Sequence, residues 1–108
     1  MTGETPSRRL RLEALLAYPP TKACREVTTI LKSFVAEYAD RLRLDIYYAG
    51  EAPSATPTAG YQNLDKQKTI PSAYVNGRMI IDGDVPPIEK IRGDIEAELA
   101  RGPSAWED

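Results

Sequence analysis

Hydrophobic and polar positions in the first half of the chain predict a strand, a helix and a second strand. Residues 10–17 begin with apolar alternation and end in a continuous apolar run, which is typical of a strand covered on both faces. After Pro19 and Pro20, apolar residues recur at spacings of three and four from about 21 to 38, which predicts a helix. Alternation over 42–48 predicts the second strand. We expect this βαβ unit to be parallel.

The second half of the chain begins with a proline-rich linker. Residues 50–69 carry Pro53, Pro57 and Gly60 among small and polar residues. About twenty residues without structure are unusual in a small domain, so we expect a short helix around 58–66.

A hairpin and a last helix are predicted after this linker. The pair Asn76-Gly77 lies between apolar runs at 72–75 and 78–81, and such a pair favours a tight turn between antiparallel strands. A final helix follows the prolines at 86 and 87 and ends just before Gly102. Its apolar face comprises Ile88, Ile91, Ile95 and Leu99.

Length and charge indicate one domain without an electrostatic preference for polyanions. The 108 residues, 42% of them hydrophobic, suit a single domain over 1–108, with an ordered core from about 9 to 102 and flexible tails at 1–8 and 103–108. A net charge of −2 predicts neither nucleic acid nor an anionic membrane as partner. We interpret the basic cluster of Arg8, Arg9 and Arg11 as solvated side chains.

The composition also limits the cellular compartments and the kinds of catalysis that we expect for this protein. The chain begins without the apolar region of a secretory signal, and no stretch approaches the roughly 18 apolar residues of a membrane span. A single cysteine fits a reducing compartment, so we predict a cytoplasmic protein. The absence of histidine excludes Cys-His and Ser-His catalysis and disfavours zinc or haem. We predict no metal and no other cofactor.

Two segments resemble the thioredoxin-like superfamily. Ala23-Cys24-Arg25-Glu26-Val27 and the residues up to Tyr38 are similar to the active-site helix of thioredoxins. Thr69-Ile70-Pro71, followed by Tyr74-Val75-Asn76-Gly77, is similar to the cis-proline strand and turn of thioredoxins, glutaredoxins and DsbA-like proteins. The resemblance covers nearly all of residues 10–100. It implies an α/β fold of order β-α-β-(α)-β-β-α, with a central four-stranded mixed sheet flanked by helices.

The resemblance also implies a degenerate active site. In this register Cys24 falls on the family's second cysteine, Thr21 on the nucleophilic first one, and Leu15 on a buried acidic residue that assists proton transfer. Because a hydroxyl has no low pKa to exploit, Thr21 cannot replace a thiolate, and dithiol exchange is not expected. In a second register, Tyr18-Pro19-Pro20-Thr21 resembles C-P-P-C with both cysteines replaced, and Cys24 is a spectator.

Thr21 and Cys24 each have a structural and a chemical interpretation. Thr21 can cap the helix, and Cys24 lies on the stripe of Val27 and Leu31 as a small buried hydrophobe. Alternatively, the helix N-terminus and the Thr21 hydroxyl stabilise a Cys24 thiolate. This T-x-x-C pair partly resembles that of peroxiredoxins, without the neighbouring motifs of that family.

Two functions follow from these interpretations. In the first, Cys24, assisted by Thr21, is the catalytic thiol of a one-cysteine oxidoreductase that forms a mixed disulfide or a sulfenic acid with a protein or small-thiol partner. In the second, the chain is a non-catalytic module that binds an extended peptide or partner protein. The binding groove in both is formed by Tyr18, Pro19, Pro20, Ile70 and Pro71, with the cis Ile70–Pro71 bond implied by the resemblance. An exposed sulfur favours chemistry, whereas a buried one favours binding or a purely structural role. The oligomeric state stays open.

Overall fold

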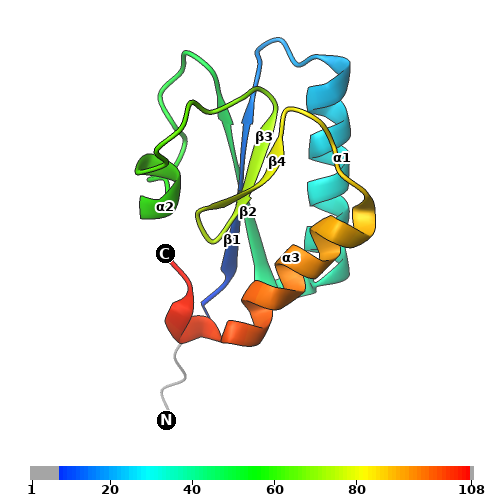
Figure 1. The fold of residues 1–108 in the computed structure, drawn as a ribbon, viewed down its shortest axis with the longest axis vertical. Coiled ribbons are helices and arrows are strands. Elements are labelled where there is room, and N and C mark those ends of the chain that lie inside the picture. Colours follow the sequence, from blue (N-terminus) through cyan, green and yellow to red (C-terminus); the bar gives the residue numbers. More distant parts are fainter. Residues whose placement is uncertain (1–7, 108) are drawn as a thin grey trace.

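The computed structural model describes residues 8–107 as a mixed α/β domain (Figure 1). The outermost tail residues, 1–7 and 108, for which flexibility was predicted, lie outside the described residues. The elements in chain order are β1 (Leu10–Leu16), α1 (Lys22–Glu37), η1 (Ala39–Arg41), β2 (Leu42–Tyr48), α2 (Ala59–Gln62), β3 (Ser72–Val75), β4 (Arg78–Asp82), α3 (Ile88–Arg101) and η2 (Pro103–Ala105).

The four strands form one mixed sheet in the order β2-β1-β3-β4. β1 and β2 are parallel, with Leu10 opposite Leu42, and this confirms the parallel βαβ unit. β3 is antiparallel to both β1 and β4. The predicted hairpin turn is also confirmed, since Asn76 and Gly77 have φ angles of 51° and 77°.

The apolar core lies between the sheet and the two long helices, which cover the same face (Figure 1). Alternate residues of β1 point into it, because side chains of a strand alternate between faces. The helices add residues spaced by three and four, as their sequence pattern predicts. The buried residues of these elements are Leu10, Leu12, Ala14 and Leu16 of β1, Cys24, Val27, Leu31 and Phe34 of α1, and Ile91, Ile95 and Leu99 of α3.

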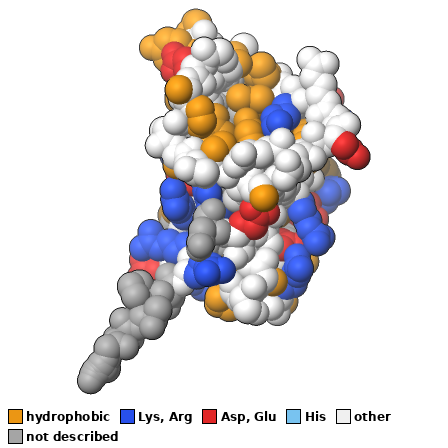
Figure 2. Space-filling model, turned by 90° about the vertical axis from the view of Figure 1, so that its left-hand side faces the viewer, with side chains coloured by type: hydrophobic (Ala, Val, Ile, Leu, Met, Phe, Trp, Pro, Cys, Tyr) orange, Lys and Arg blue, Asp and Glu red, His pale blue; other side chains and the backbone are white. Residues whose placement is uncertain are grey.

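The opposite face of the sheet carries α2, which is shorter than predicted. Thr58 caps the helix by accepting a hydrogen bond from the Tyr61 amide, but the helix ends at Gln62 rather than near residue 66. A longer helix is disfavoured by tertiary contacts, because Lys66 and Thr69 extend toward β4 and bind the two carboxylate oxygens of Asp82. Figure 2 views this side of the molecule and shows hydrophobic side chains gathered over its upper half.

Residues 103–107, for which flexibility was predicted, pack against the domain in this structure. Trp106 is only 6% exposed, and its indole donates a hydrogen bond of 2.7 Å to the backbone oxygen of Glu98. Arg8, assigned to the other tail, donates to the Trp106 carbonyl at 2.7 Å. Glu107 then accepts from the amides of Ala59 and Gly60 at the start of α2. Burial of the indole opposes the chain entropy that normally loosens a terminus.

A glycine pair holds α2 against the β3–β4 turn. A Cβ added to Gly60 would lie 2.6 Å from the carbonyl oxygen of Gly77, a backbone atom that cannot move away cheaply. Gly93, inside α3, has no atom within 4 Å of its Cβ position. Both glycines therefore lie in helices, but only Gly60 is closely packed against another part of the chain.

We predict opposite effects of the same substitution at these positions. Gly60→Ala should lower the free energy of unfolding by about 1–3 kcal/mol, the usual cost of overpacking. Gly93→Ala should raise it by about 0.5–1 kcal/mol, because alanine favours a helix more than glycine does. Urea unfolding followed by circular dichroism measures both. A stable Gly60→Ala protein would contradict the close approach of α2 and the turn.

Candidate functional site

The N-terminus of α1 is built around Thr21 and Cys24. Thr21 is the N-cap, and its Oγ1 accepts from the Cys24 amide at 3.2 Å, which confirms the capping interpretation. The same hydroxyl donates to the Cys24 sulfur at 3.1 Å, and the Ala17 amide donates to this sulfur at 3.4 Å. Cys24 itself is 0% exposed and belongs to the apolar core. The sulfur is thus buried but hydrogen bonded.

Opposing influences set the pKa of the Cys24 thiol. Burial is the largest, and it raises the pKa because it disfavours the charged thiolate. The Thr21 hydroxyl, the amides of Ala17 and Thr21, and the charge of Arg25 all lower it. Together they prevail, so the pKa of Cys24 lies below its ordinary value. The site favours a thiolate while shielding it from solvent.

The segment of Ile70 and Pro71 lies at the same end of the sheet. Leu15, near the end of β1, is opposite Ser72, the first residue of β3, so the segment that enters β3 lies at the same end of the sheet as the stretch that leads from β1 into α1 (Figure 1). The Ile70–Pro71 bond is cis, and so is the Tyr18–Pro19 bond, which the sequence did not predict. The structure therefore brings both predicted groups of site residues to one end of the sheet.

The surface at this end is apolar and exposed. Tyr18 is 69% exposed and Ile70 is 46% exposed, two of the three large hydrophobic side chains that protrude among the described residues. Pro19 and Pro20 are exposed as well, whereas Pro71 is buried. Tyr18 packs edge-on against Tyr48, with ring centroids 5.5 Å apart, and this contact helps to fix the position of the exposed ring.

The backbone of Ile70 is open to a partner while its neighbours are fixed. Within residues 8–107, neither its N–H nor its C=O makes a hydrogen bond. Pro71 accepts from the Gly83 amide at 2.8 Å, and Thr69 donates to Asp82 at 2.6 Å. Hydrogen bonds from Lys66 and Thr69 hold the pKa of Asp82 below its ordinary value. Free backbone groups on a held segment are suited to pairing with another strand.

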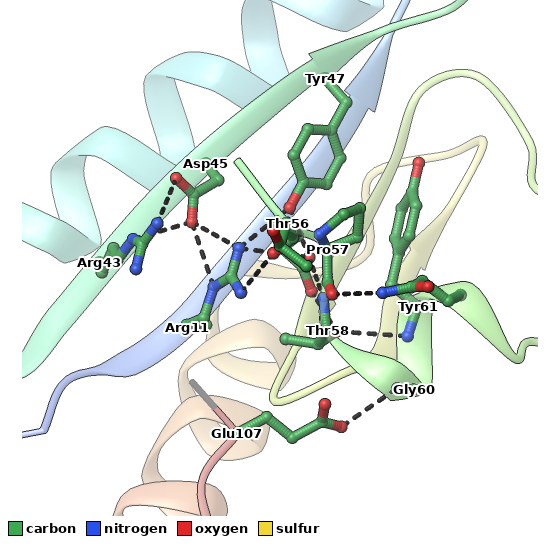
Figure 3. A network of polar contacts seen from close by, with 12 residues as sticks. Arg11, Arg43, Asp45, Tyr47, Thr56, Pro57, Thr58, Gly60, Tyr61 and Glu107 are labelled. Carbon is green, nitrogen blue, oxygen red and sulfur yellow. Dashed lines mark hydrogen bonds and ion pairs between the residues drawn. The ribbon is translucent and has the colours of Figure 1, made fainter. Parts of the chain in front are cut away.

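A buried polar network that the sequence patterns did not predict underlies α2 (Figure 3). Glu13 is 0% exposed, and its carboxylate accepts from the Tyr47 hydroxyl at 2.6 Å and from the amide and hydroxyl of Thr58 at 2.9 and 2.5 Å. Arg11 donates to Asp45 at 2.9 Å and to the Thr56 carbonyl at 2.8 Å. Every oxygen of the Glu13 carboxylate thus has a donor, as a buried charge requires.

The interpretation of Arg11 as a solvated side chain is wrong, since Arg11 is only 2% exposed. The signal was present in the chain: charged residues alternate with leucines in a strand predicted to be covered on both faces. Arg11 lies opposite Arg43 in the parallel strand β2, and Asp45, two residues further along β2, is on the same face and is the partner of Arg11. The buried acid in this part of the fold is Glu13, two residues before Leu15.

Three tyrosines pack above this network. Tyr61 of α2 meets Tyr47 and Tyr74 edge to face, at centroid distances of 5.1 and 4.8 Å. Burial, followed by the influence of Tyr74 and Glu13, raises the pKa of Tyr61 to about 12. Burial also raises the pKa of Tyr47 and of Tyr74. The neutral phenol is the form that the folded protein favours.

Comparison with known proteins finds no family model and no curated protein that matches the chain. Among residues 8–107, no helix is long and apolar enough to cross a membrane.

We predict that alkaline pH destabilises the protein through Tyr61. An unfolded tyrosine loses its proton near pH 10, whereas folded Tyr61 retains it to about pH 12. The stability from this group is complete below pH 10 and is lost as the pH rises toward 12. Urea unfolding at pH 9 to 11.5 should show a shallower decline in Tyr61→Phe than in the wild type.

Tyr18→Phe is the matched control, because Tyr18 is exposed. Its decline should parallel that of the wild type. Equal slopes for Tyr61→Phe and the wild type would mean that the Tyr61 phenol is not protected from ionisation by the fold.

Proposed function

We propose that this chain is a thioredoxin-like domain that has lost dithiol chemistry and binds an extended segment of a partner protein. The element order, the cap of α1 at Thr21 and the proline at the start of β3 support the family assignment. The observation that carries the function is the contrast between a buried Cys24 sulfur and Ile70, which is 46% exposed and whose backbone makes no hydrogen bond within residues 8–107.

The partner segment would bind by strand addition. Its backbone would pair with the free N–H and C=O of Ile70, which supply affinity independent of sequence. Its side chains would contact the apolar surface of Tyr18, Pro19, Pro20 and Ile70. Removal of that surface from water favours association in proportion to the apolar area covered. Asp82 supports the arrangement by holding Thr69 and Lys66.

Burial of the sulfur disfavours catalysis as the main function. A nucleophilic thiolate must reach the substrate, and Cys24 is 0% exposed in the described fold. Thr21 is exposed but has no adjacent base among its hydrogen-bond partners, so it is a poor nucleophile. Both residues are better explained as the cap and core of α1.

A peptide selection tests the binding function. A random decapeptide display library is selected on the wild-type domain, and the affinities of the enriched peptides are measured by fluorescence anisotropy. Tyr18→Asp and Ile70→Asp should each weaken binding about tenfold or more, because each removes a central apolar contact. The amide of Ile70 should also exchange more slowly with solvent when a peptide is bound.

Ile88→Asp is the matched control. Ile88 is 42% exposed, much like Ile70, but it lies at the start of α3. This variant should bind the selected peptides as the wild type does. Failure to enrich any peptide, or equal binding by Ile70→Asp, would rule out the groove as the binding surface.

A second function is supported by the hydrogen bonds to the Cys24 sulfur. Two donors and a lowered pKa make this thiol more acidic than an ordinary cysteine. In a one-cysteine oxidoreductase, the Cys24 thiolate would attack a disulfide of a protein or small-thiol partner. One new S–S bond would form to Cys24, the original S–S bond would break, and the other sulfur would leave as a thiolate. Such attack requires α1 to open first.

The thiol reaction distinguishes the two functions. If binding is the function, DTNB should react with native Cys24 about a hundredfold more slowly than with the urea-unfolded chain, because local opening limits access. Thr21→Val should raise the pH midpoint of the native reaction, since it removes a hydrogen bond that stabilises the thiolate. Thr29→Val, on the exposed part of α1, should leave the midpoint unchanged.

Fast modification of Cys24 in the native protein near neutral pH would instead favour the oxidoreductase.

A cytoplasmic location, the lack of a cofactor, and the exclusion of nucleic acid and membranes as partners remain predictions from the sequence.

A further inference from the structure

A second candidate site lies on the face of the sheet that carries α2. A hollow of about 350 Å³ opens between the end of β2, the segment after it and α2. Leu15 lines it from the sheet, and the other lining side chains include Tyr47, Tyr61, Pro53 and Pro57. The hydrophobic side chains in the upper half of Figure 2 lie on this side of the molecule. The volume is in the range of small-molecule pockets and too small for a helix.

The aromatic walls are suited to a positive charge. The face of an aromatic ring carries negative potential and attracts ammonium groups. The Tyr47 hydroxyl donates to the Glu13 carboxylate at 2.6 Å and accepts from Arg11 at 3.1 Å, which fixes this ring at the wall of the hollow. Tyr61 already attracts a cation of the chain, because Nζ of Lys68 lies 4.7 Å from its ring centroid. Lys68 itself does not line the hollow.

The charge at the mouth has the complementary sign. Glu51 lines the hollow and is exposed, and within residues 8–107 its carboxylate has no hydrogen-bond or ion-pair partner. Neither lysine nor arginine is among the described lining residues. A ligand with an anionic group would therefore meet the Glu51 carboxylate with no cationic side chain among the described lining residues, whereas a cationic group would meet a charge of opposite sign.

We infer that this hollow binds a small organic cation, with a ring-sized apolar body between Tyr47, Tyr61 and the prolines and an ammonium group beside Glu51. The two prolines hold the outer wall in shape, because a proline has a fixed φ. The hollow adjoins the surface of Tyr18 and Ile70, since Tyr48 lines it and packs against Tyr18, but the inference does not depend on the function proposed for that surface.

Three probes with the same ring but different charge test the inference: 2-phenylethylamine, 2-phenylethanol and phenylacetate. Each is titrated into the ¹⁵N-labelled protein at pH 7, and amide shifts are followed by NMR. The amine should bind most tightly and at least about fivefold more tightly than phenylacetate, given one ion pair and ring contacts. The largest shifts should fall on Gly50, Glu51 and Tyr61.

Glu51→Gln isolates the charge without disturbing the fold, since Glu51 is exposed. It should weaken binding of the amine about threefold to fivefold, the effect of one exposed ion pair, and leave binding of the alcohol unchanged. Glu26→Gln, an exposed site on α1, is the control and should change neither.

Equal binding of all three probes would overturn the inference, because the hollow would then be merely apolar. An unchanged amine affinity in Glu51→Gln, or shifts scattered away from the hollow, would overturn it as well.

Discussion

The buried carboxylate of Glu13 is the constraint on which the α2 side of the molecule depends. A carboxylate removed from water is stable only when protein donors replace the lost hydration. The donors come from β2, through the Tyr47 hydroxyl, and from Thr58 at the start of α2. Because Thr58 also caps α2, the same residue satisfies the charge and begins the helix.

This arrangement places the linker between β2 and α2 over the sheet. Once Thr58 is bound to Glu13, Tyr61 lies one turn later and packs between Tyr47 and Tyr74. The contact between Gly60 and Gly77 and the carboxylate of Glu107 hold α2 from two further sides. Two residues that bound the aromatic hollow, Tyr47 and Tyr61, are therefore held in place through the buried carboxylate of Glu13.

The candidate groove is governed by the other end of β1. There the Ala17 amide and the Thr21 hydroxyl both donate to the Cys24 sulfur, so the start of α1 is fastened to the end of the strand. The chain between them exposes Tyr18 and two prolines beside Ile70. These hydrogen bonds to the thiol stabilise the surface next to it, and the proposed binding surface is the part of this region that is exposed to solvent.

Local patterns in the sequence determined the secondary structure closely. The periods of two and of about 3.6 located β1, β2, α1 and α3 to within about one residue of the observed ends, and Asn76-Gly77 located the hairpin turn. The sequence also identified Thr21 as a cap. These features depend on residues only a few positions apart, so a single sequence contains the information.

Only the tertiary structure determined which charged residues are buried and where residues near the chain ends pack. Arg11 and Glu13 are buried because Asp45, Tyr47 and Thr58, which lie far from them in the sequence, come together around them. The burial of Trp106, the early end of α2 and the shielding of Cys24 likewise depend on residues distant in sequence. Such contacts produce no periodic pattern in the sequence, because the free energy of a buried polar group depends on partners that are close in space but not along the chain.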